Sequence, residues 1–297
     1  MALTCIDPEK LYAKDINIKR EDVKIIQEWL KKQPHLPPVE EMQIIISLHS
    51  CYYRIEAAKL TIDNYFTIRN LCPELFQGLD REVFKRISNS LFASVLTKKT
   101  PEGYAVLMMR LLDEKLEVFN CTTFLNYIIM IATLYLHQNG YQNGAVAIFD
   151  MKGFGLGHAT RLNLNVIKHA LNFIQDGLPV RIKGVHVINA LPLADKILAM
   201  LKPFIKGDLY NMIQFHPPGS ETLYKHVPKE CLPEEYGGQL SSMQTLNEET
   251  VSNVFDHFDF YKWHDQQKVD ESRRISKSKF VNEGFGVDGT FKKLEID

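Results

Sequence analysis

Between about residues 100 and 240, short runs of β-type residues alternate with longer helical runs. The β-type runs are rich in branched and aromatic residues and lie at residues 105–112, 145–151, 184–189 and 212–216. Between them lie residues 119–138, 159–175 and 193–205, whose apolar residues recur at helical spacing. Strands separated by helices favour a mainly parallel sheet with right-handed crossovers. We therefore predict an α/β fold for this part of the chain.

The region before this alternation has helical spacing only. Val23, Ile26 and Leu30 recur at helical intervals, and prolines at 34, 37 and 38 then interrupt the pattern. The 297 residues suit two modest domains. We predict a helical N-terminal domain over residues 1–90, an α/β domain over 91–245, and a C-terminal helix (251–267) with a tail over 246–297.

Composition and charge exclude several classes of protein. The formal net charge is -1, and no basic stretch is interleaved with aromatic residues, so we expect no nucleic-acid partner. The five cysteines are scattered and form no C-x-x-C pair, which argues against a disulfide framework or zinc site and favours a reducing compartment. The first residues lack a long apolar stretch, so we expect no signal peptide. The most apolar run, 127–136, is shorter than the roughly 20 residues of a membrane crossing. These features predict a cytoplasmic protein.

Two helical segments carry more apolar surface than docking on a sheet requires. Residues 124–136 (FLNYIIMIATLYL) are apolar nearly all round, and residues 162–174 carry two apolar stripes. One stripe is enough to pack on a sheet, so the second needs another neighbour. An enclosed apolar ligand is one candidate and an ordinary α/β core is the other, and spacing alone does not distinguish them.

Motifs for catalysis are missing from this sequence. The segment GAVAIFDMKGFGLGH (144–158) is a strand running into glycines, but Gly153, Gly155 and Gly157 are evenly spaced and do not match G-x-G-x-x-G. We find no G-x-S-x-G, phosphate loop or H-E-x-x-H. Asp150 has no identifiable partner base, so we expect it to cap a turn, and His186 is expected to be a satisfied or ligand-facing polar group. We predict no enzymatic activity, no cofactor and no metal site.

Five segments together resemble one family. They are GAVAIFDMKGFGLGH, LPVRIKGVHVINALPLADKILAMLKPFI (178–205), VPKECLPEEYGGQL (227–240), the helical stretch 51–76, and the terminal GFGVDGTFKKLEID. From about residue 16 to the end, the chain resembles CRAL-TRIO lipid-transfer proteins, of the branch with α-tocopherol transfer and retinaldehyde-binding proteins.

The resemblance implies a sheet that floors a hydrophobic cavity and a gate helix, about 193–205, that covers it. The chain would carry a tocopherol, retinoid or carotenoid type of lipid between membranes, as a monomer. An alternative is a membrane-recruited, lipid-sensing adaptor without transfer activity. By position, the implied lining consists of Phe124, Tyr127, Ile128, Ile131, Phe149, Leu162, Phe173, Ile174, Val180, Ile182, Val187, Leu193, Ile197, Met200 and Leu201.

The resemblance also implies a basic cluster beside the gate that holds phosphoinositide head groups at an anionic membrane. Arg181 and Lys183 match one half of this cluster, and Lys206 is a candidate for the rest. The remaining family positions fall on Tyr210 and Met212, which are not basic. The N-terminal domain also departs from the family pattern, because Ser47-Leu48-His49 stands where the family usually has Phe-Leu-Arg. We expect this difference to affect contacts between the two domains more than the ligand.

Overall fold

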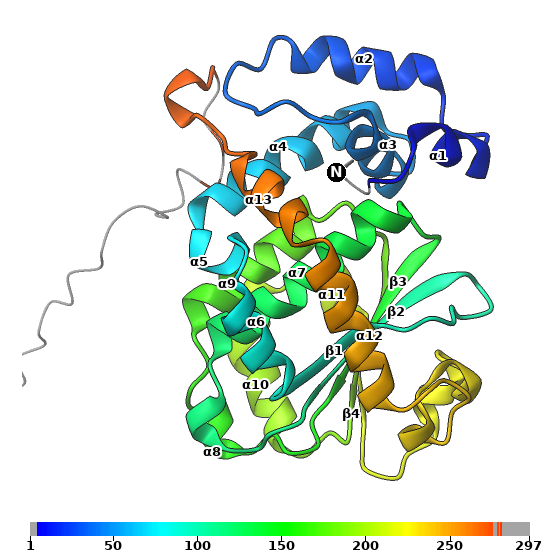
Figure 1. Cartoon of the computed structure of the whole chain (residues 1–297), viewed down its shortest axis with the longest axis vertical. Helices are drawn as coiled ribbons and strands as arrows, with labels where there is room; N and C mark the ends of the chain where they lie inside the picture. Colours follow the sequence, from blue (N-terminus) through cyan, green and yellow to red (C-terminus); the bar gives the residue numbers. More distant parts are fainter. Residues whose placement is uncertain (1–4, 276–277, 279, 281–297) are drawn as a thin grey trace, which may run out of the picture.

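The computed structural model describes residues 5–275, 278 and 280. Figure 1 shows a lobe of helices from the N-terminal part of the chain above a sheet with its own helices. The molecule is thus a helical unit joined to an α/β unit, which confirms the predicted fold class.

The N-terminal lobe is built from short helices whose ends are set by proline and by capping side chains. Asp7 accepts a hydrogen bond from the backbone of Glu9 at the start of α1, and Glu40 and Gln43 form a capping box at the start of α3. The prolines at 34, 37 and 38 separate α2 from α3. The helices are α1 (Pro8–Lys14), α2 (Arg20–Leu30), α3 (Glu41–Ser50), α4 (Ile55–Leu71) and α5 (Pro73–Phe76).

The sheet has five strands in the order β1-β2-β3-β4-β5. They are β1 (Leu91–Val95), β2 (Tyr104–Leu111), β3 (Gly144–Asp150), β4 (Ile182–Ile188) and β5 (Ile213–His216). β1 pairs with β2 antiparallel, and the other pairs are parallel. Strands β2 to β5 lie where the sequence predicts them. β1 was not predicted, because LFASV is short and buried on both faces and so shows no alternation.

The connections between the parallel strands all lie on one face of the sheet. Successive strands are neighbours in the same direction, so right-handed crossovers place their helices on the same side. Two predicted helices are shorter than expected: within 159–175 the main α-helix covers only Leu164–Asn172 and is followed by a π-turn, and 193–205 ends in a 3-10 turn. The crossover elements are α7 (Cys121–Asn139), α8 (Leu156–Ala159), α9 (Leu164–Asn172), the π-turn Phe173–Gly177, α10 (Leu193–Leu201), the 3-10 turn Lys202–Phe204 and α11 (Gly207–Asn211).

Residues 217–240 cover the opposite face of the sheet with a chain of 3-10 turns. Leu223, Val227 and Leu232 pack there against strand residues such as Ile148. The short turns of the chain are Leu116–Val118, Thr222–Lys225, Lys229–Cys231, Glu234–Tyr236 and Glu271–Arg273.

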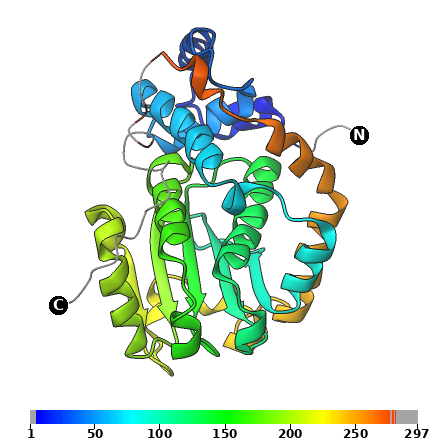
Figure 2. The same cartoon turned by 90° about the vertical axis from the view of Figure 1, so that its left-hand side faces the viewer.

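Three further helices pack around the α/β unit, and the last of them reaches the N-terminal unit. α6 (Arg81–Ser88) buries Phe84 in the sheet's core cluster, and α12 (Met243–Asp256) contributes to the clusters on both faces, so it crosses the β1 edge. The predicted C-terminal helix is two helices, α12 and α13 (Phe258–Gln266), and α13 reaches α4 through a hydrogen bond between His264 and Tyr65. Figure 2 shows α12 along one side of the α/β unit and α10 on the opposite side.

Candidate functional site

The two faces of the sheet are packed differently. The face that residues 217–240 cover is closely packed: its strand residues Val146, Ile148 and Ile188 are at most 6% exposed. On the helix-covered face, the register places small and aromatic apolar residues of three strands side by side. We call this set the open apolar face: Ala147 and Phe149 on β3, Val185 and Val187 on β4, and Ile213 and Phe215 on β5.

The residues of the open apolar face are not buried, although they lie beneath helices. Phe149 is 40% exposed, and the other five are half-buried. β3 and β4 are interior strands, so this exposure does not arise from the edge of the sheet. In a parallel sheet both faces are normally covered by close packing. The helices therefore cover β3, β4 and β5 incompletely, and these apolar side chains remain partly exposed.

Helix α10 follows β4 and belongs to the layer above the open apolar face. It begins four residues after Asn189, whose left-handed φ of 50° turns the chain out of the strand. Ala194 is the only residue of α10 that is buried. Leu193, Ile197, Leu198 and Leu201 are half-buried, and Met200 is 38% exposed. An apolar helix that buries so little of itself is suited to move away from the sheet.

The predicted lining residues divide into two groups. Most lie on partly open elements: Ile128, Leu162, Ile174, Val180, Ile182, Val187, Leu193, Ile197 and Leu201 are half-buried, and Phe149 and Met200 are exposed. Phe124, Tyr127, Ile131 and Phe173 are instead at most 5% exposed.

Tyr127 illustrates the second group. It is fully buried on α7, with its ring centroid 4.6 Å from that of Phe84 on α6. Its hydroxyl has no hydrogen-bond partner, and burial raises the pKa of that hydroxyl. Tyr127 therefore packs in the core beside α6, and a contact with a ligand remains a prediction.

Sequence reasoning missed four residues of the open apolar face: Ala147, Val185, Ile213 and Phe215. Ile213 and Phe215 are two apart on β5, as Val185 and Val187 are on β4. This period of two was the available signal, because it places them on one face of the sheet.

The two predicted membrane-binding residues on β4 and just before it contact the N-terminal unit. Arg181 donates from Nε to the carbonyl oxygen of His49 at 3.0 Å, and its guanidinium lies 4.1 Å from the centroid of the Tyr52 ring. Lys183 donates to the Tyr52 hydroxyl at 3.1 Å but is itself exposed. The pair thus joins the two units at the place where the sequence departs from the family pattern.

The backbone beside Arg181 has an uncommon conformation. Tyr52 and Tyr53 have φ values of 53° and 62°, a left-handed region that costs free energy for side chains of this size. His49 stacks on Tyr141 with ring centroids 3.9 Å apart, and burial together with Arg181 lowers the pKa of His49 to about 4. His49 is therefore neutral at pH 7.

Lys206, the third predicted membrane-binding residue, is paired within the protein. Its Nζ lies 2.5 Å from Oδ1 of Asp176 in the π-turn, although half of its side chain remains exposed. Its side chain lies at the C-terminal end of the gate.

Asp150 is a structural carboxylate. It accepts hydrogen bonds from Asn189 Nδ2 at 2.7 Å, from the Lys152 backbone at 2.8 Å and from the Tyr236 hydroxyl at 2.5 Å. Arg110 Nε lies 3.8 Å away. The side chain is 1% exposed, so these contacts fix the strand end and leave no free base for catalysis.

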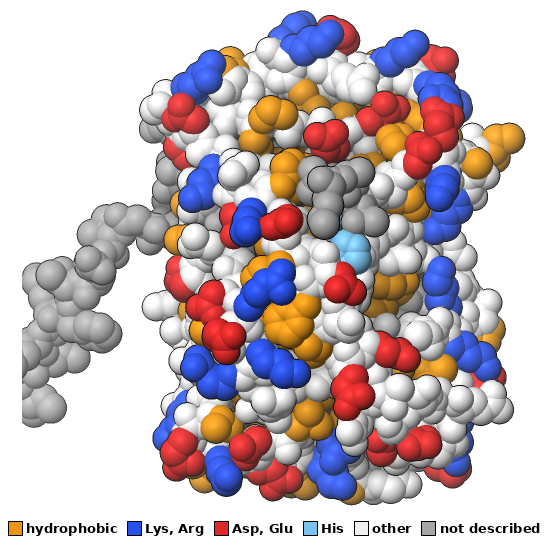
Figure 3. All heavy atoms as spheres, in the orientation of Figure 1, with side chains coloured by type: hydrophobic (Ala, Val, Ile, Leu, Met, Phe, Trp, Pro, Cys, Tyr) orange, Lys and Arg blue, Asp and Glu red, His pale blue; other side chains and the backbone are white. Residues whose placement is uncertain are grey.

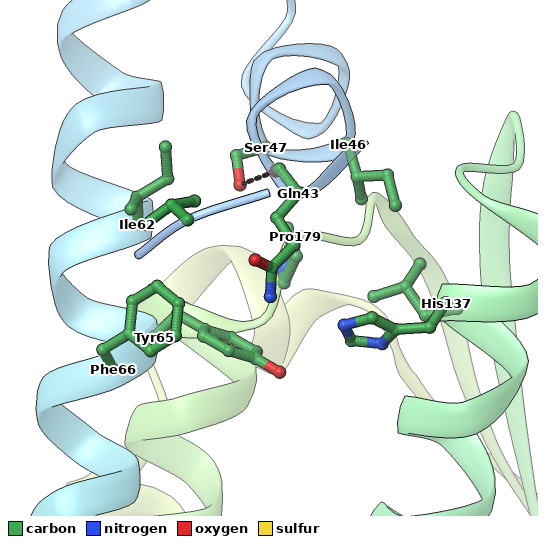
Figure 4. A pocket seen from close by; sticks show the side chains of 10 residues that line it. Gln43, Ile46, Ser47, Ile62, Tyr65, Phe66, His137 and Pro179 are labelled. Atoms are coloured by element: carbon green, nitrogen blue, oxygen red, sulfur yellow. Dashed lines mark hydrogen bonds between the residues drawn. The ribbon is translucent and has the colours of Figure 1, made fainter. Parts of the chain in front are cut away.

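A small hollow lies between the N-terminal helices and α7. Figure 4 shows Gln43, Tyr65 and His137 around it. It measures about 20 Å³, room for one water molecule and not for a lipid. His137 Nε2 has no hydrogen-bond partner, and burial lowers the pKa of His137 to about 4.

The outer surface in view carries mixed charge. Figure 3 shows acidic and basic side chains interspersed over both units, in keeping with the net charge of -1. Within residues 5–275, 278 and 280, no helix has the length and apolar character needed to cross a bilayer. In the same ranges, no group of three or more His, Cys, Asp or Glu side chains could hold a metal ion.

Family models match both units of this chain. Residues 89–238 match the CRAL/TRIO domain, and residues 15–85 match the Pinta-like UBA domain. The first match contains all five strands of the sheet and α10.

Individual relatives are similar over most of the chain. The alpha-tocopherol transfer protein-like protein of Mus musculus is 28% identical over 229 residues, which cover 76% of this chain and 67% of that protein. Clavesin-1 of Xenopus laevis is 26% identical over 192 residues, which cover 64% of this chain and 58% of that protein. The crystal structure of Sfh5 aligns with a TM-score of 0.50 at 16% identity, covering 82% of this chain and 99% of Sfh5, which supports the fold.

Proposed function

This chain belongs to the CRAL/TRIO domain family, and on that premise we propose that it binds one small hydrophobic lipid. The lipid would lie between α10 and the open apolar face, and the chain would carry it between membranes. The family and its relatives support lipid binding or transfer in general terms. The ligand, its place and the transfer step are our proposal. We further propose that the chain acts without catalysis, as a cytoplasmic monomer that touches membranes transiently.

The half-exposed apolar residues of interior strands carry this proposal. Phe149, 40% exposed in the middle of a covered sheet, would meet water if nothing else filled the space. Enclosing about 500 Å² of apolar ligand surface contributes about 12 kcal/mol at roughly 25 cal/mol per Å². Association costs remove a large part of this, and micromolar binding needs about 8 kcal/mol net.

Release follows from the same energetics. A ligand held by apolar contact gains nothing by leaving for water, so it should leave where α10 can open against lipid. The half-buried residues Ile197 and Leu201 would then find an apolar environment in the membrane. An opening that exposes them to water alone is disfavoured.

The membrane surface is proposed to be anionic, with Arg181, Lys183 and Lys206 as its contacts. Lys183 is the most available of the three, since Arg181 is bound to His49 and Lys206 to Asp176. Tyr210 and Met212 supply no positive charge. We therefore propose attraction to anionic lipid in general, with phosphoinositides as one form of it, and a ligand of the tocopherol, retinoid or carotenoid type.

Transfer of all-trans-retinol and α-tocopherol from donor to acceptor vesicles tests the proposal. A carrier accelerates transfer in proportion to protein concentration. Binding of either lipid without faster transfer would contradict the transfer step and favour the lipid-sensing adaptor.

A further inference from the structure

The C-terminal end of the gate is fastened to the π-turn Phe173–Gly177. Gln175 donates from Nε2 to the carbonyl oxygen of Phe204 at 3.0 Å, and its Oε1 accepts from the backbone N–H of Lys206 at 2.6 Å. The next residue, Asp176, pairs with Lys206 Nζ at 2.5 Å. Two consecutive side chains therefore hold both residues that flank Ile205. We call this arrangement the latch.

The latch is fixed on the N-terminal unit. The carbonyl oxygen of Asp176 accepts a hydrogen bond from Asn64 Nδ2 on α4 at 3.1 Å. A Cβ on Gly177 would lie 3.2 Å from Cα of Tyr65, so the turn sits against the backbone of α4. The π-turn is thus placed between α4 and the end of the gate, and π-turns often mark functional positions within helices.

The Gln175 side chain is held in place from both ends. Its Nε2 also donates to the carbonyl oxygen of Leu171 on α9 at 3.0 Å. By contrast, α10 itself buries only Ala194, and no side chain caps its N-terminus. Polar contacts at the latch therefore contribute much of what holds a helix with so little packing of its own.

We propose that Gln175 and Asp176 are positioning residues that hold α10 closed and couple its opening to α4 through Asn64. Opening the gate requires the contacts to Phe204 and Lys206 to break, and a shift of α4 moves the turn that makes them. The effect of the latch on the position of α10 does not depend on a ligand. Its effect on lipid release rests on the proposed carrier function.

Hydrogen exchange of the backbone amides of residues 193–205 in the ligand-free chain tests the latch directly. Gln175→Leu removes both contacts of that side chain to the end of the gate, together with its contact to Leu171, and we expect exchange to become about tenfold faster. Unchanged exchange in a folded Gln175→Leu variant would overturn the latch. Asn64→Ala tests the coupling: faster exchange of the same amides supports it, and exchange as in the wild type contradicts it.

A matched pair of lysines separates the latch from membrane attraction. Lys206 and Lys202 are both exposed at the same end of the gate, but Lys202 lies 5.3 Å over the Tyr210 ring and has no part in the latch. Lys206→Met and Lys202→Met each remove one positive charge. The latch predicts that only Lys206→Met speeds exchange, by roughly threefold for one ion pair. Equal effects of the two variants would contradict it.

Dissociation of all-trans-retinol into excess phosphatidylcholine vesicles connects the latch to the ligand. These vesicles are neutral, so charge attraction does not contribute. We expect faster release from Gln175→Leu and Lys206→Met, and the wild-type rate from Lys202→Met. If the latch variants exchange faster but the chain binds no retinol, the latch is supported and the choice of ligand is contradicted. Retinol bound and released at one common rate by all variants would overturn the role of the latch in release.

Discussion

The guanidinium of Arg181 binds the backbone carbonyl oxygen of His49 and lies over the ring of Tyr52. A residue expected at a membrane surface thus joins the α/β unit to the helical unit. Lys183, two residues further on, keeps its side chain exposed and contacts Tyr52 by one hydrogen bond. The two basic residues therefore have separable roles.

Arg181→Ala is expected to lower the free energy of unfolding by about 2 kcal/mol, because a charged hydrogen bond and the packing on Tyr52 are lost. Lys183→Ala should change it by less than about 0.5 kcal/mol, as an exposed substitution does. Urea unfolding measures both. Lys183→Ala should instead slow delivery of retinol to anionic vesicles at low salt, and an unchanged rate there would remove Lys183 from the membrane contact.

Adding volume to the sheet tests whether the space above it is empty. Ala147 and Ala93 point to the same helix-covered face, but Ala93 is fully buried and Ala147 is half-buried. Ala93→Leu should cost about 1 to 3 kcal/mol of stability, because it overfills a packed core. Ala147→Leu should cost little and weaken retinol binding at least tenfold. Equal destabilisation by the two substitutions would show that the space is filled by side chains.

A charge on the inner side of the gate should abolish ligand binding. Ile197 is half-buried on α10, whereas Ala199 on the same helix is exposed. Ile197→Asp places an unpaired carboxylate against the ligand, at a cost of several kcal/mol. Ala199→Asp is the matched control and should bind retinol as the wild type does. Retinol titration measures both, and unchanged affinity in folded Ile197→Asp would remove this residue from the lining.

Buried histidines predict a loss of stability in acid. Burial lowers the pKa of His137 to about 4 in the folded protein, from about 6.5 when exposed. The unfolded chain therefore binds more protons between these values, so this contribution is complete above pH 6.5 and is lost as pH falls towards 4. His49 and His186 act in the same direction.

His137→Phe keeps the ring and removes this titration. Urea unfolding between pH 7.5 and 5 should show a shallower decline in the variant, by at most about 1.4 kcal/mol per pH unit. Parallel declines in the two proteins would contradict the assignment of His137.

The parallel strands could be predicted because their residues are apolar in short runs between helical patterns. β1 could not, since four of its five residues are buried, on both faces of the sheet, and they include Ala93 and Ser94. The helix predicted over 159–175 is interrupted because α9 ends in the π-turn that meets α4. Such an interruption depends on tertiary contacts, which spacing does not reveal.

The ligand site itself stays a prediction, and the contacts that the structure shows around it were not predictable. The resemblance placed the gate at α10 and the lining near β3 and β4, including Phe149. It did not indicate that Arg181 would bind a backbone carbonyl of the N-terminal unit, because the partner is main chain and leaves no mark in the sequence. Likewise Phe124 and Tyr127 share helical faces with residues that are partly open, and only packing shows that they are buried.

Native mass spectrometry of the purified chain, followed by organic extraction of any bound molecule, tests the central claim most directly. The account predicts one small hydrophobic lipid per chain, present in the wild type and in Ala199→Asp and lost in Ala147→Leu. A chain that carries no lipid after purification, and takes up neither retinol nor α-tocopherol when they are supplied, would contradict it.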